Sequence, residues 1–192
     1  MPLLWRDSVD AHRHAVRESV LDAVGAIYTD AGPTGLTMSA VAERAGIGRG
    51  TLYRYFADTR ELLLAWHERQ VRSHLEHLRH VRAHSTDSDH ALRAVLEAYA
   101  SLSSAHSEEP ATAGLHFEGY VAEAQHELHA LLRDLLGEES RRGRVRVDVD
   151  VDVLAIYCVH ALGAARQATA PDARRVITDL VMDALRPRAA GS

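Results

Sequence analysis

The sequence predicts an all-α protein, with a three-helix N-terminal head that contains a helix-turn-helix and a larger C-terminal helical body. Apolar residues recur at helical spacing along most of the 192 residues. A glycine hinge, Gly46-Ile47-Gly48, separates two short helical patterns between residues 36 and 64. Residues 145–153 alternate like a strand, but no second strand is available to pair with them, and a single strand is not stable alone.

The first helix of the head is expected from about Ser8 to Ala31, where Gly32-Pro33 ends it. Thr37 is a suitable N-cap for the second helix, and residue 47 or 48 opens the third. Gly46 can adopt the left-handed conformation that ends a helix. The second and third helices are therefore expected to meet at a sharp corner.

Each short helix of this corner has one apolar stripe that can pack on a shared core. The apolar positions are Val41, Ala42, Ala45, Leu52 and Phe56. On the third helix, Arg49, Gly50 and Tyr53 lie on a neighbouring face, which stays free. This arrangement is typical of a helix-turn-helix, in which the second helix of the motif contacts DNA.

Residues 37–56 read TMSAVAERAGIGRGTLYRYF and form this corner. The run resembles the signature of the tetracycline-repressor (TetR) family of bacterial transcriptional regulators. The resemblance covers about residues 14–66, and it continues more weakly along the rest of the chain. Residues 143–165, GRVRVDVDVDVLAIYCVHALGAA, are similar to the entry into the penultimate helix, which helps these proteins to dimerise. The resemblance implies a homodimeric repressor that leaves a palindromic operator when a small organic effector binds.

The resemblance also implies which residues contact double-stranded DNA. Arg49, Gly50 and Tyr53 would reach base edges or thymine methyl groups, and an arginine can form a bidentate contact with guanine. The residues that would hold phosphates through hydroxyls and amides are Thr37, Ser39, Thr51, Tyr53 and Tyr55. At the start of the fourth helix the family usually has a phosphate-binding lysine, whereas this chain has Thr59 followed by Arg60. A hydroxyl at a helix N-terminus can still hold a phosphate, but it lacks the full charge.

The expected domains are a DNA-binding head, residues 1–60, and a body, residues 61–192. A fourth helix should run from Asp58-Thr59 to about His84, where apolar residues recur at intervals of seven, four and three. Further helical patterns cover residues 89–106, 111–137 and 151–170, and a last one runs from Pro171-Asp172 to Leu185.

Two segments of the body lie between helical patterns. Residues 137–144 contain charges and two glycines, which predicts a mobile surface loop. For residues 145–153 we expect an extended segment that leads into a helix, because Asp150 is a good N-cap.

The charge pattern permits nucleic-acid binding without requiring it. Residues 1–60 hold seven arginines and seven acids, whereas residues 44–60 hold four arginines and only Asp58. The remaining residues carry an excess of five acids, which would repel DNA from the body. All 22 basic residues are arginine, which we attribute to genomic composition.

The composition favours a cytoplasmic protein without membrane contact, metal or cofactor. Cys158 is the single cysteine, so neither a disulfide framework nor a zinc finger is available. The longest nearly apolar run, Val153 to Ala165, is shorter than the roughly 20 residues that span a bilayer. The chain has no nucleophile triad, phosphate loop or paired-carboxylate motif, so we do not expect an enzyme.

The fourth helix carries an unusual group of histidines: His74, His77, His80 and His84. At about 100° per residue they spread over an arc of roughly 120°, so one helix cannot bring three of them to one metal ion. A solvated polar face is the simpler interpretation. A metal- or pH-responsive sensor built on this helix remains the alternative function.

Polar and aromatic residues on the body helices form a candidate ligand pocket, since such pockets are apolar with a few placed polar groups. The candidate residues are Trp66, Tyr99, His106, His116, Phe117, Tyr120, Tyr157 and His160. The last two helices also carry wide apolar surfaces, which predict a four-helix interface between two chains. The expected interface residues are Leu154, Cys158, Ala161, Leu162, Ala165, Ile177, Leu180, Val181 and Ala184.

Overall fold

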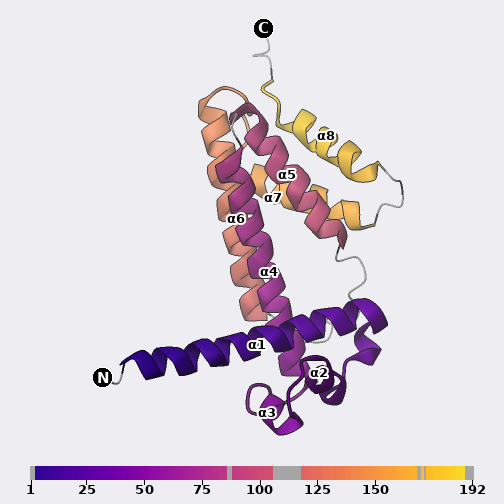
Figure 1. Cartoon of the computed structure of the whole chain (residues 1–192). Helices are drawn as coiled ribbons and strands as arrows, with labels where there is room; N and C mark the ends of the chain where they lie inside the picture. Colours follow the sequence, from indigo (N-terminus) through magenta and orange to yellow (C-terminus); the bar gives the residue numbers. More distant parts are fainter. Residues whose placement is uncertain (1–2, 86–87, 106–117, 168–169, 171, 189–192) are drawn as a thin grey trace. The chain divides into compact units, whose positions relative to one another are not determined.

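The computed structural model describes residues 3–85, 88–105, 118–167, 170 and 172–188, and it contains only helices and turns among them (Figure 1). The prediction of an all-α protein is therefore confirmed. The chain forms two compact units, Met1–Gln70 and Val71–Ser192, each with its own apolar core. No helix in the described part of the chain is long and apolar enough to cross a membrane.

The first unit contains α1 (Leu3–Ala31), a 3-10 turn (Pro33–Gly35), α2 (Met38–Arg44), α3 (Arg49–Tyr53) and the beginning of α4 (Thr59–His84). α1 begins five residues before the expected Ser8 and ends at Ala31 as expected, followed by Gly32 with φ 66°. Its second half packs on the short helices. The buried residues of this core include Val20, Leu21, Val24, Val41, Leu52, Phe56 and Leu62.

α4 begins with a reciprocal cap that the sequence encodes as Asp58 and Glu61. The Glu61 N–H donates to Asp58 Oδ1 at 2.8 Å, and the Ala57 N–H donates to Glu61 Oε2 at 2.6 Å. The two units meet within α4, at residues 70 and 71, whereas we expected the domain boundary at 60 and 61. The first two turns of α4 belong to the first unit because Leu62, Ala65 and Trp66 are buried in its core.

The second unit contains the rest of α4 together with α5 (Ser88–Ala105), α6 (Glu118–Arg141), α7 (Val151–Gly163), a 3-10 turn (Ala164–Arg166) and α8 (Ala173–Leu185). α7 packs against α5, α6 and α8, and α8 also packs against α5. The expected helix 151–170 is shorter, because its α-helical part ends at Gly163. The expected start of the helix 111–137 lies outside the described residues.

The prediction of a mobile loop at residues 137–144 is wrong. α6 continues to Arg141, and the side chain of Glu139 is almost fully buried. Its Oε1 accepts hydrogen bonds from Arg142 Nη1 at 2.9 Å and Arg144 Nη2 at 2.8 Å. Arg144 first, and Arg142 to a lesser degree, lower the pKa of the Glu139 carboxyl, against the opposing effect of burial. A buried carboxylate held by two guanidinium groups therefore fixes this end of α6.

Residues 145–150 form an extended segment that leads into α7, as expected. Val145 is buried in the second core, and the Arg146 N–H donates to the Leu185 carbonyl at the end of α8. Asp150 caps α7, because its Oδ1 accepts the Asp152 N–H at 2.8 Å. The prediction of an N-cap at Asp150 is confirmed.

We expect Glu139→Gln to lower the free energy of unfolding by about 1 to 3 kcal/mol at neutral pH, because Arg142 and Arg144 lose their charged partner. The folded-state pKa of Glu139 is lowered, so its contribution is complete above the ordinary glutamate pKa of about 4.3 and is lost as the pH falls through the folded-state value. Urea unfolding at pH 7 and pH 3 would test this.

Glu123→Gln is the matched control on the same helix, because the Glu123 side chain is exposed. It should change stability little at either pH. A loss for Glu139→Gln that is equal at the two pH values would contradict the role assigned to its charge.

Candidate nucleic-acid interface

The corner between α2 and α3 is built by backbone conformation and local capping. Thr37 Oγ1 accepts the Ala40 N–H at 3.1 Å and so caps α2, as predicted. Gly46 has φ 67°, the left-handed conformation expected where α2 ends. The Ile47 N–H donates to the Ala42 carbonyl at 3.0 Å, and Gly48 is the N-cap residue of α3. The chain thus turns from α2 into α3 within four residues, 45–48.

α3 has one buried side and one free side. Leu52 is fully buried and Phe56, just beyond the helix, is 2% exposed, so these two residues fix α3 on the core. Arg49, Gly50 and Thr51 are exposed, and the Tyr53 side chain is 55% exposed. The expectation that this face stays free of the core is confirmed.

The other predicted DNA-contacting residues differ in exposure. Ser39 in α2 and Tyr55 after α3 are half-buried, and Tyr55 packs against the first core. Arg60 is exposed in the first turn of α4. Thr59 is half-buried beside it, and Asp58 rather than Thr59 makes the cap. The Thr59 hydroxyl therefore remains available at the helix start.

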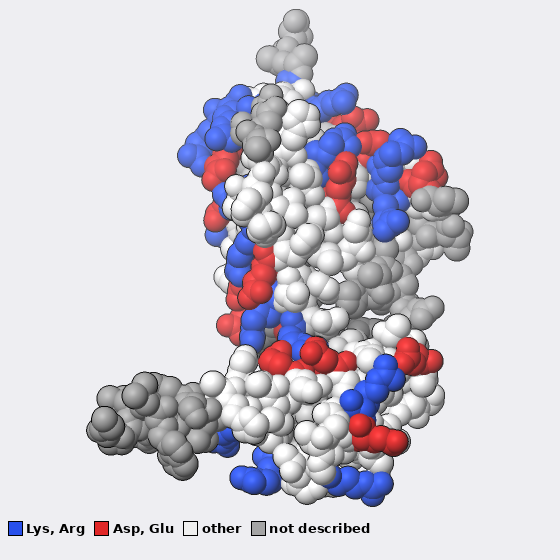
Figure 2. Space-filling view, in the orientation of Figure 1, with Lys and Arg blue, Asp and Glu red and all other residues white. Residues whose placement is uncertain are grey.

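Several arginines lie around this corner. Within the described residues, Arg49, Arg54 and Arg60 form no ion pair with a carboxylate. Figure 2 shows basic side chains along the rim of the unit that carries α3. Guanidinium groups that are not neutralised by a neighbouring acid can bind phosphates or guanine edges. We predicted Arg49 and Arg60 but missed Arg54, which lies at the C-cap of α3.

The described residues of the predicted ligand pocket do not come together, and the pocket itself stays a prediction. Trp66 lies in the core of the first unit, 5.0 Å from Tyr28 between ring centroids. Gly25 leaves room for its indole, since a Cβ there would lie 3.0 Å from Trp66 Nε1. Tyr157 and His160 are exposed on α7, and only Tyr99 is half-buried against the second core. His106, His116 and Phe117, and the Tyr120 side chain, lie outside what the structure describes.

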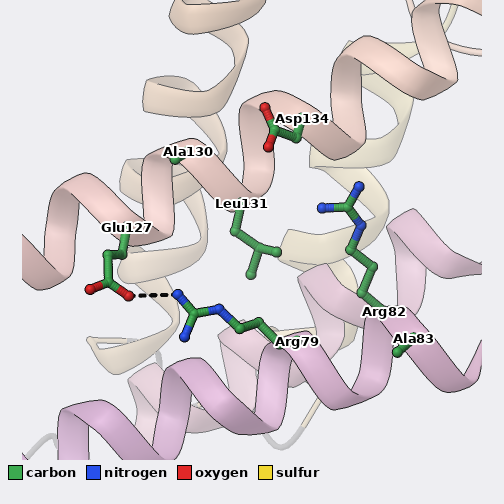
Figure 3. Close-up of a pocket in the computed structure, with 7 residues that line it drawn as sticks. All are labelled: Arg79, Arg82, Ala83, Glu127, Ala130, Leu131 and Asp134. Carbon is green, nitrogen blue, oxygen red and sulfur yellow. Dashed lines mark hydrogen bonds and ion pairs between the residues drawn. The ribbon is translucent and has the colours of Figure 1, made fainter.

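A groove between α4 and α6 was not predicted. It has a volume of about 540 Å³ and is lined by Arg79, Arg82, Ala83, Glu127, Ala130, Leu131 and Asp134. Figure 3 shows the Arg79 side chain reaching from α4 to Glu127 on α6, at 2.6 Å, with Leu131 between the helices. Arg82 similarly pairs with Glu138. These arginines tie α4 to α6.

The histidines of α4 do not converge. The rings of His80 and His84 stack at 3.8 Å between centroids, while His77 is exposed. Within the described residues, no three side chains of His, Cys, Asp or Glu come together as metal ligands.

The expected interface residues divide into two groups. Leu154, Cys158, Leu162, Ala165 and Val181 are buried in the core of their own chain, so their assignment to a dimer interface is wrong. Burial also raises the pKa of the Cys158 thiol to about 12. Ala161, Ile177 and Ala184 are half-buried, and Leu180 is 61% exposed. The outer face that we call the α7–α8 apolar face consists of Val153, Ile156, Tyr157, Val176 and Leu180.

Comparison with known proteins agrees with this geometry. Residues 20–66, which cover the corner and its flanking helices, match the family described as "Bacterial regulatory proteins, tetR family". This part of the chain therefore resembles the DNA-binding region of TetR-family regulators. The transcriptional activator FasR of Mycolicibacterium smegmatis is 32% identical over 83 residues, which are 43% of this chain. The match spans only 38% of the length of FasR.

Two solved structures show that the TetR-like fold extends over most of the chain. A TetR/AcrR-family regulator from Thermobifida fusca matches with a TM-score of 0.73 and 18% identity, over 88% of this chain and 98% of that one. FadR of Bacillus subtilis, solved with stearoyl-CoA, matches with a TM-score of 0.67 and 16% identity, over 86% of this chain and 95% of that one. At these identities the likeness concerns the fold.

We expect Gly46→Ala to lower the stability of the first unit by about 1 to 2 kcal/mol, because a side chain at a left-handed position is strained. Gly50→Ala is the control within the same motif. Nothing lies within 4 Å of a Cβ at Gly50, and alanine favours a helix, so stability should be kept or rise by up to about 1 kcal/mol. Denaturant unfolding followed by tryptophan fluorescence reports on the first unit, which contains both tryptophans. Equal losses for the two variants would contradict the geometry of the corner.

Proposed function

We propose that this protein is a transcriptional regulator of the TetR type that binds a palindromic DNA operator as a homodimer. The observation that supports it most directly is the free face of α3, held in place by Leu52 and Phe56 and bordered by unpaired arginines. In this proposal α3 enters the major groove. Arg49 reads a guanine, Tyr53 meets a base edge or thymine methyl, and Gly50 allows close approach of the backbone.

The remaining residues of the motif would contact the DNA backbone and fix the register of α3. Thr51 is exposed on α3, and Arg60 and Thr59 lie at the start of α4. Thr37, Ser39 and Tyr55 complete this set in the proposal. Thr37 would act through the N-terminus of the helix that it caps, because its own oxygen is engaged in the cap.

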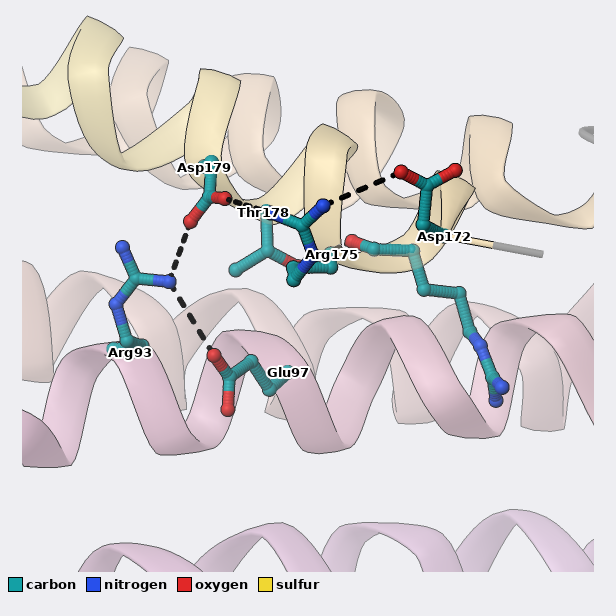
Figure 4. Close-up of polar contacts among 7 residues, drawn as sticks. Arg93, Glu97, Asp172, Arg175, Thr178 and Asp179 are labelled. Carbon is teal, nitrogen blue, oxygen red and sulfur yellow. Dashed lines mark hydrogen bonds and ion pairs between the residues drawn. The ribbon is translucent and has the colours of Figure 1, made fainter. Parts of the chain in front are cut away.

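The α7–α8 apolar face supports the homodimer. Its five large apolar side chains, three on α7 and two on α8, are between 40% and 61% exposed. Figure 4 shows how α8 is held on α5: Arg93 contacts Asp179 at 2.7 Å, and Asp179 also pairs with Arg175. The ion pairs lie on the side of α8 that faces α5, which leaves Val176 and Leu180 exposed for a partner chain. Two copies related by a two-fold axis would form a four-helix interface.

α4 is the element through which an effector could act. In the first unit its Arg69 pairs with Glu18 and Asp22 of α1, and in the second unit Arg79 and Arg82 pair with α6. A small organic effector that favours a different position of α4 in the body would change the separation of the two heads and release the operator. We propose repression as the basal activity, in the cytoplasm and without a catalytic step. The stearoyl-CoA bound by Bacillus subtilis FadR makes acyl-CoA thioesters the first effectors to test.

A metal-responsive sensor on the α4 histidines is less well supported. The TetR family match explains the corner around Gly46, which such a sensor would not require. Elemental analysis of the purified protein would distinguish the two functions.

Binding of this protein to its own upstream DNA should weaken about 10³- to 10⁵-fold between roughly 50 and 200 mM salt, if a dimer contacts on the order of six to ten phosphates. Arg49→Ala should weaken binding to the preferred DNA sequence by about 1 to 3 kcal/mol and relax the preference at one base pair. Thr51→Ala, two residues further along α3, should weaken binding to all DNA sequences about equally. Gel-shift titrations with single-base operator variants would measure both effects.

The regulator proposal fails if the unmodified protein does not retard its upstream DNA even at low salt. A loss that is uniform over all sequences for Arg49→Ala would instead show that Arg49 contacts a phosphate.

We expect Leu180→Glu to give a folded monomer that no longer binds the operator, because its carboxylate would be desolvated without a partner in an interface that buries about 2,000 Å² or more. Leu162→Glu should instead unfold the body, since Leu162 is fully buried within its own chain. Gln125→Glu adds the same charge at an exposed position of α6 and should leave the dimer intact. Light scattering at micromolar concentration would test all three. A monomeric unmodified protein would contradict the homodimer, and a dimeric Leu180→Glu variant would show that the interface is elsewhere.

A further inference from the structure

The pairing of arginines differs between the two units. In the second unit most described arginines contact a carboxylate: Arg79, Arg82, Arg93, Arg133, Arg142, Arg144, Arg146, Arg175, Arg186 and Arg188. In the first unit only Arg44 and Arg69 do so among the described residues. The other described arginines of that unit form no ion pair: Arg13, Arg17, Arg49, Arg54 and Arg60. Two of these five, Arg13 and Arg17, lie on α1, outside the helix-turn-helix.

Arg17 connects α1 to the end of α3. Its guanidinium carbon lies 5.3 Å from the centroid of the Phe56 ring, a cation–π contact that places the charge beside the residue at which α3 joins the core. Arg54, the C-cap residue of α3, precedes Phe56 by two positions and is exposed. Arg17 therefore continues the row of unpaired arginines from α3 onto α1.

Arg13 lies one turn of α1 further toward the N-terminus, about 6 Å along the helix axis from Arg17. Two acids of α1, Glu18 and Asp22, are on another side, whereas Asp10 lies on the side of Arg13 and Arg17 but forms no ion pair with either arginine within the described residues. At about 100° per residue, Glu18 and Asp22 lie roughly 100° to 180° around the helix from Arg13 and Arg17. Both acids pair with Arg69 of α4. α1 thus has an acidic side that pairs with α4 and, next to the end of α3, a basic side on which two arginines outnumber Asp10.

The N-terminal half of α1, as far as its side chains are described (residues 10–17), does not contribute to the core of its unit. Residues 10–15 are all exposed, and the first buried residue is Val20. Figure 1 shows this half of α1 extending past α2 and α3. A helix gains most of its stability in a protein from tertiary packing, so an extension without core contacts is suited to a partner. The unpaired arginines indicate an anionic one.

We propose that the basic side of α1, through Arg13 and Arg17, binds the phosphate backbone of the DNA that flanks the base pairs read by α3. The inference rests on the proposed DNA-binding function and extends its footprint beyond the helix-turn-helix. These contacts carry affinity and salt dependence rather than sequence information, because phosphates are the same at every base pair.

The test is Arg13→Gln combined with Arg17→Gln, measured as the slope of log affinity against log salt on the protein's own upstream DNA. Each phosphate contact that is lost should make the slope shallower by about 0.9. The ratio of affinities for the operator and for a single-base variant of it should stay unchanged. Arg72→Gln combined with Arg174→Gln is the matched control, because both residues are exposed, lie in the second unit and form no ion pair within the described residues.

A second arm uses shortened DNA. On DNA from which base pairs have been trimmed at both ends of the protected region, Arg13 and Arg17 have no phosphate to contact. The slope of log affinity against log salt for the unmodified protein should then become as shallow as that for the double variant. Arg13→Gln alone should give about half of the change, and because the Arg13 side chain is exposed, its melting temperature should match that of the unmodified protein.

An unchanged slope for the double variant overturns the inference and leaves the regulator proposal intact. A change that appears only with Arg17→Gln, together with a lower melting temperature, also overturns it, because the effect then comes from the lost packing on Phe56. Failure of the unmodified protein to bind any DNA would instead contradict the proposed function itself.

Discussion

The left-handed turn at Gly46 is the constraint on which the DNA-binding unit depends. α3 has only five residues, too few for a helix that is stable on its own. It persists because the turn brings Leu52 and Phe56 onto a core supplied by α1 and α4. The same turn decides which residues of α3 remain outside. Strain at one backbone position would thus affect both the folding of the unit and the face that we propose for DNA.

A second constraint concerns charge. The chain contains no lysine, so arginine has to serve both in structural ion pairs and in the proposed DNA contacts. What separates the two roles is the presence of a carboxylate. The buried Glu139 engages Arg142 and Arg144, and Asp179 engages Arg93, whereas the arginines around α3 have no such neighbour among the described residues. An unpaired guanidinium costs little at the surface and is ready to bind a phosphate.

The features that the sequence predicted correctly are local ones. The cap at Thr37, the turn at Gly46 and the cap at Asp150 each depend on a few consecutive residues whose preferences are intrinsic. The start of α4 is also encoded locally, by Asp58 and Glu61. The all-α class followed from apolar spacing, which needs no knowledge of which helices are neighbours.

The errors arose where the outcome depends on which helix is packed against which face. Apolar spacing shows that α7 has apolar residues on several sides, but it does not tell which side faces α5 and α6. Leu154 and Leu162 therefore looked as suitable for an interface as Leu180. Trp66 was assigned to the body because it follows the expected boundary, although a glycine at position 25 of α1 leaves space for its indole. Glu139 looked like a loop residue because its two arginine partners follow it among polar residues.

α4 combines both kinds of constraint, because one helix has to satisfy two separate cores. Its first turns bury Leu62 and Trp66 in the first unit, and its later turns bury Leu75 and Leu78 in the second. Arg69 ties the early part to α1, while Arg79 and Arg82 tie the later part to α6. The contacts of α4 in each unit are thus made by different stretches of one helix, each with its own core and its own ion pairs. This division of α4 between two cores is the physical basis of our proposal that an effector bound in the second unit acts on the unit that carries α3.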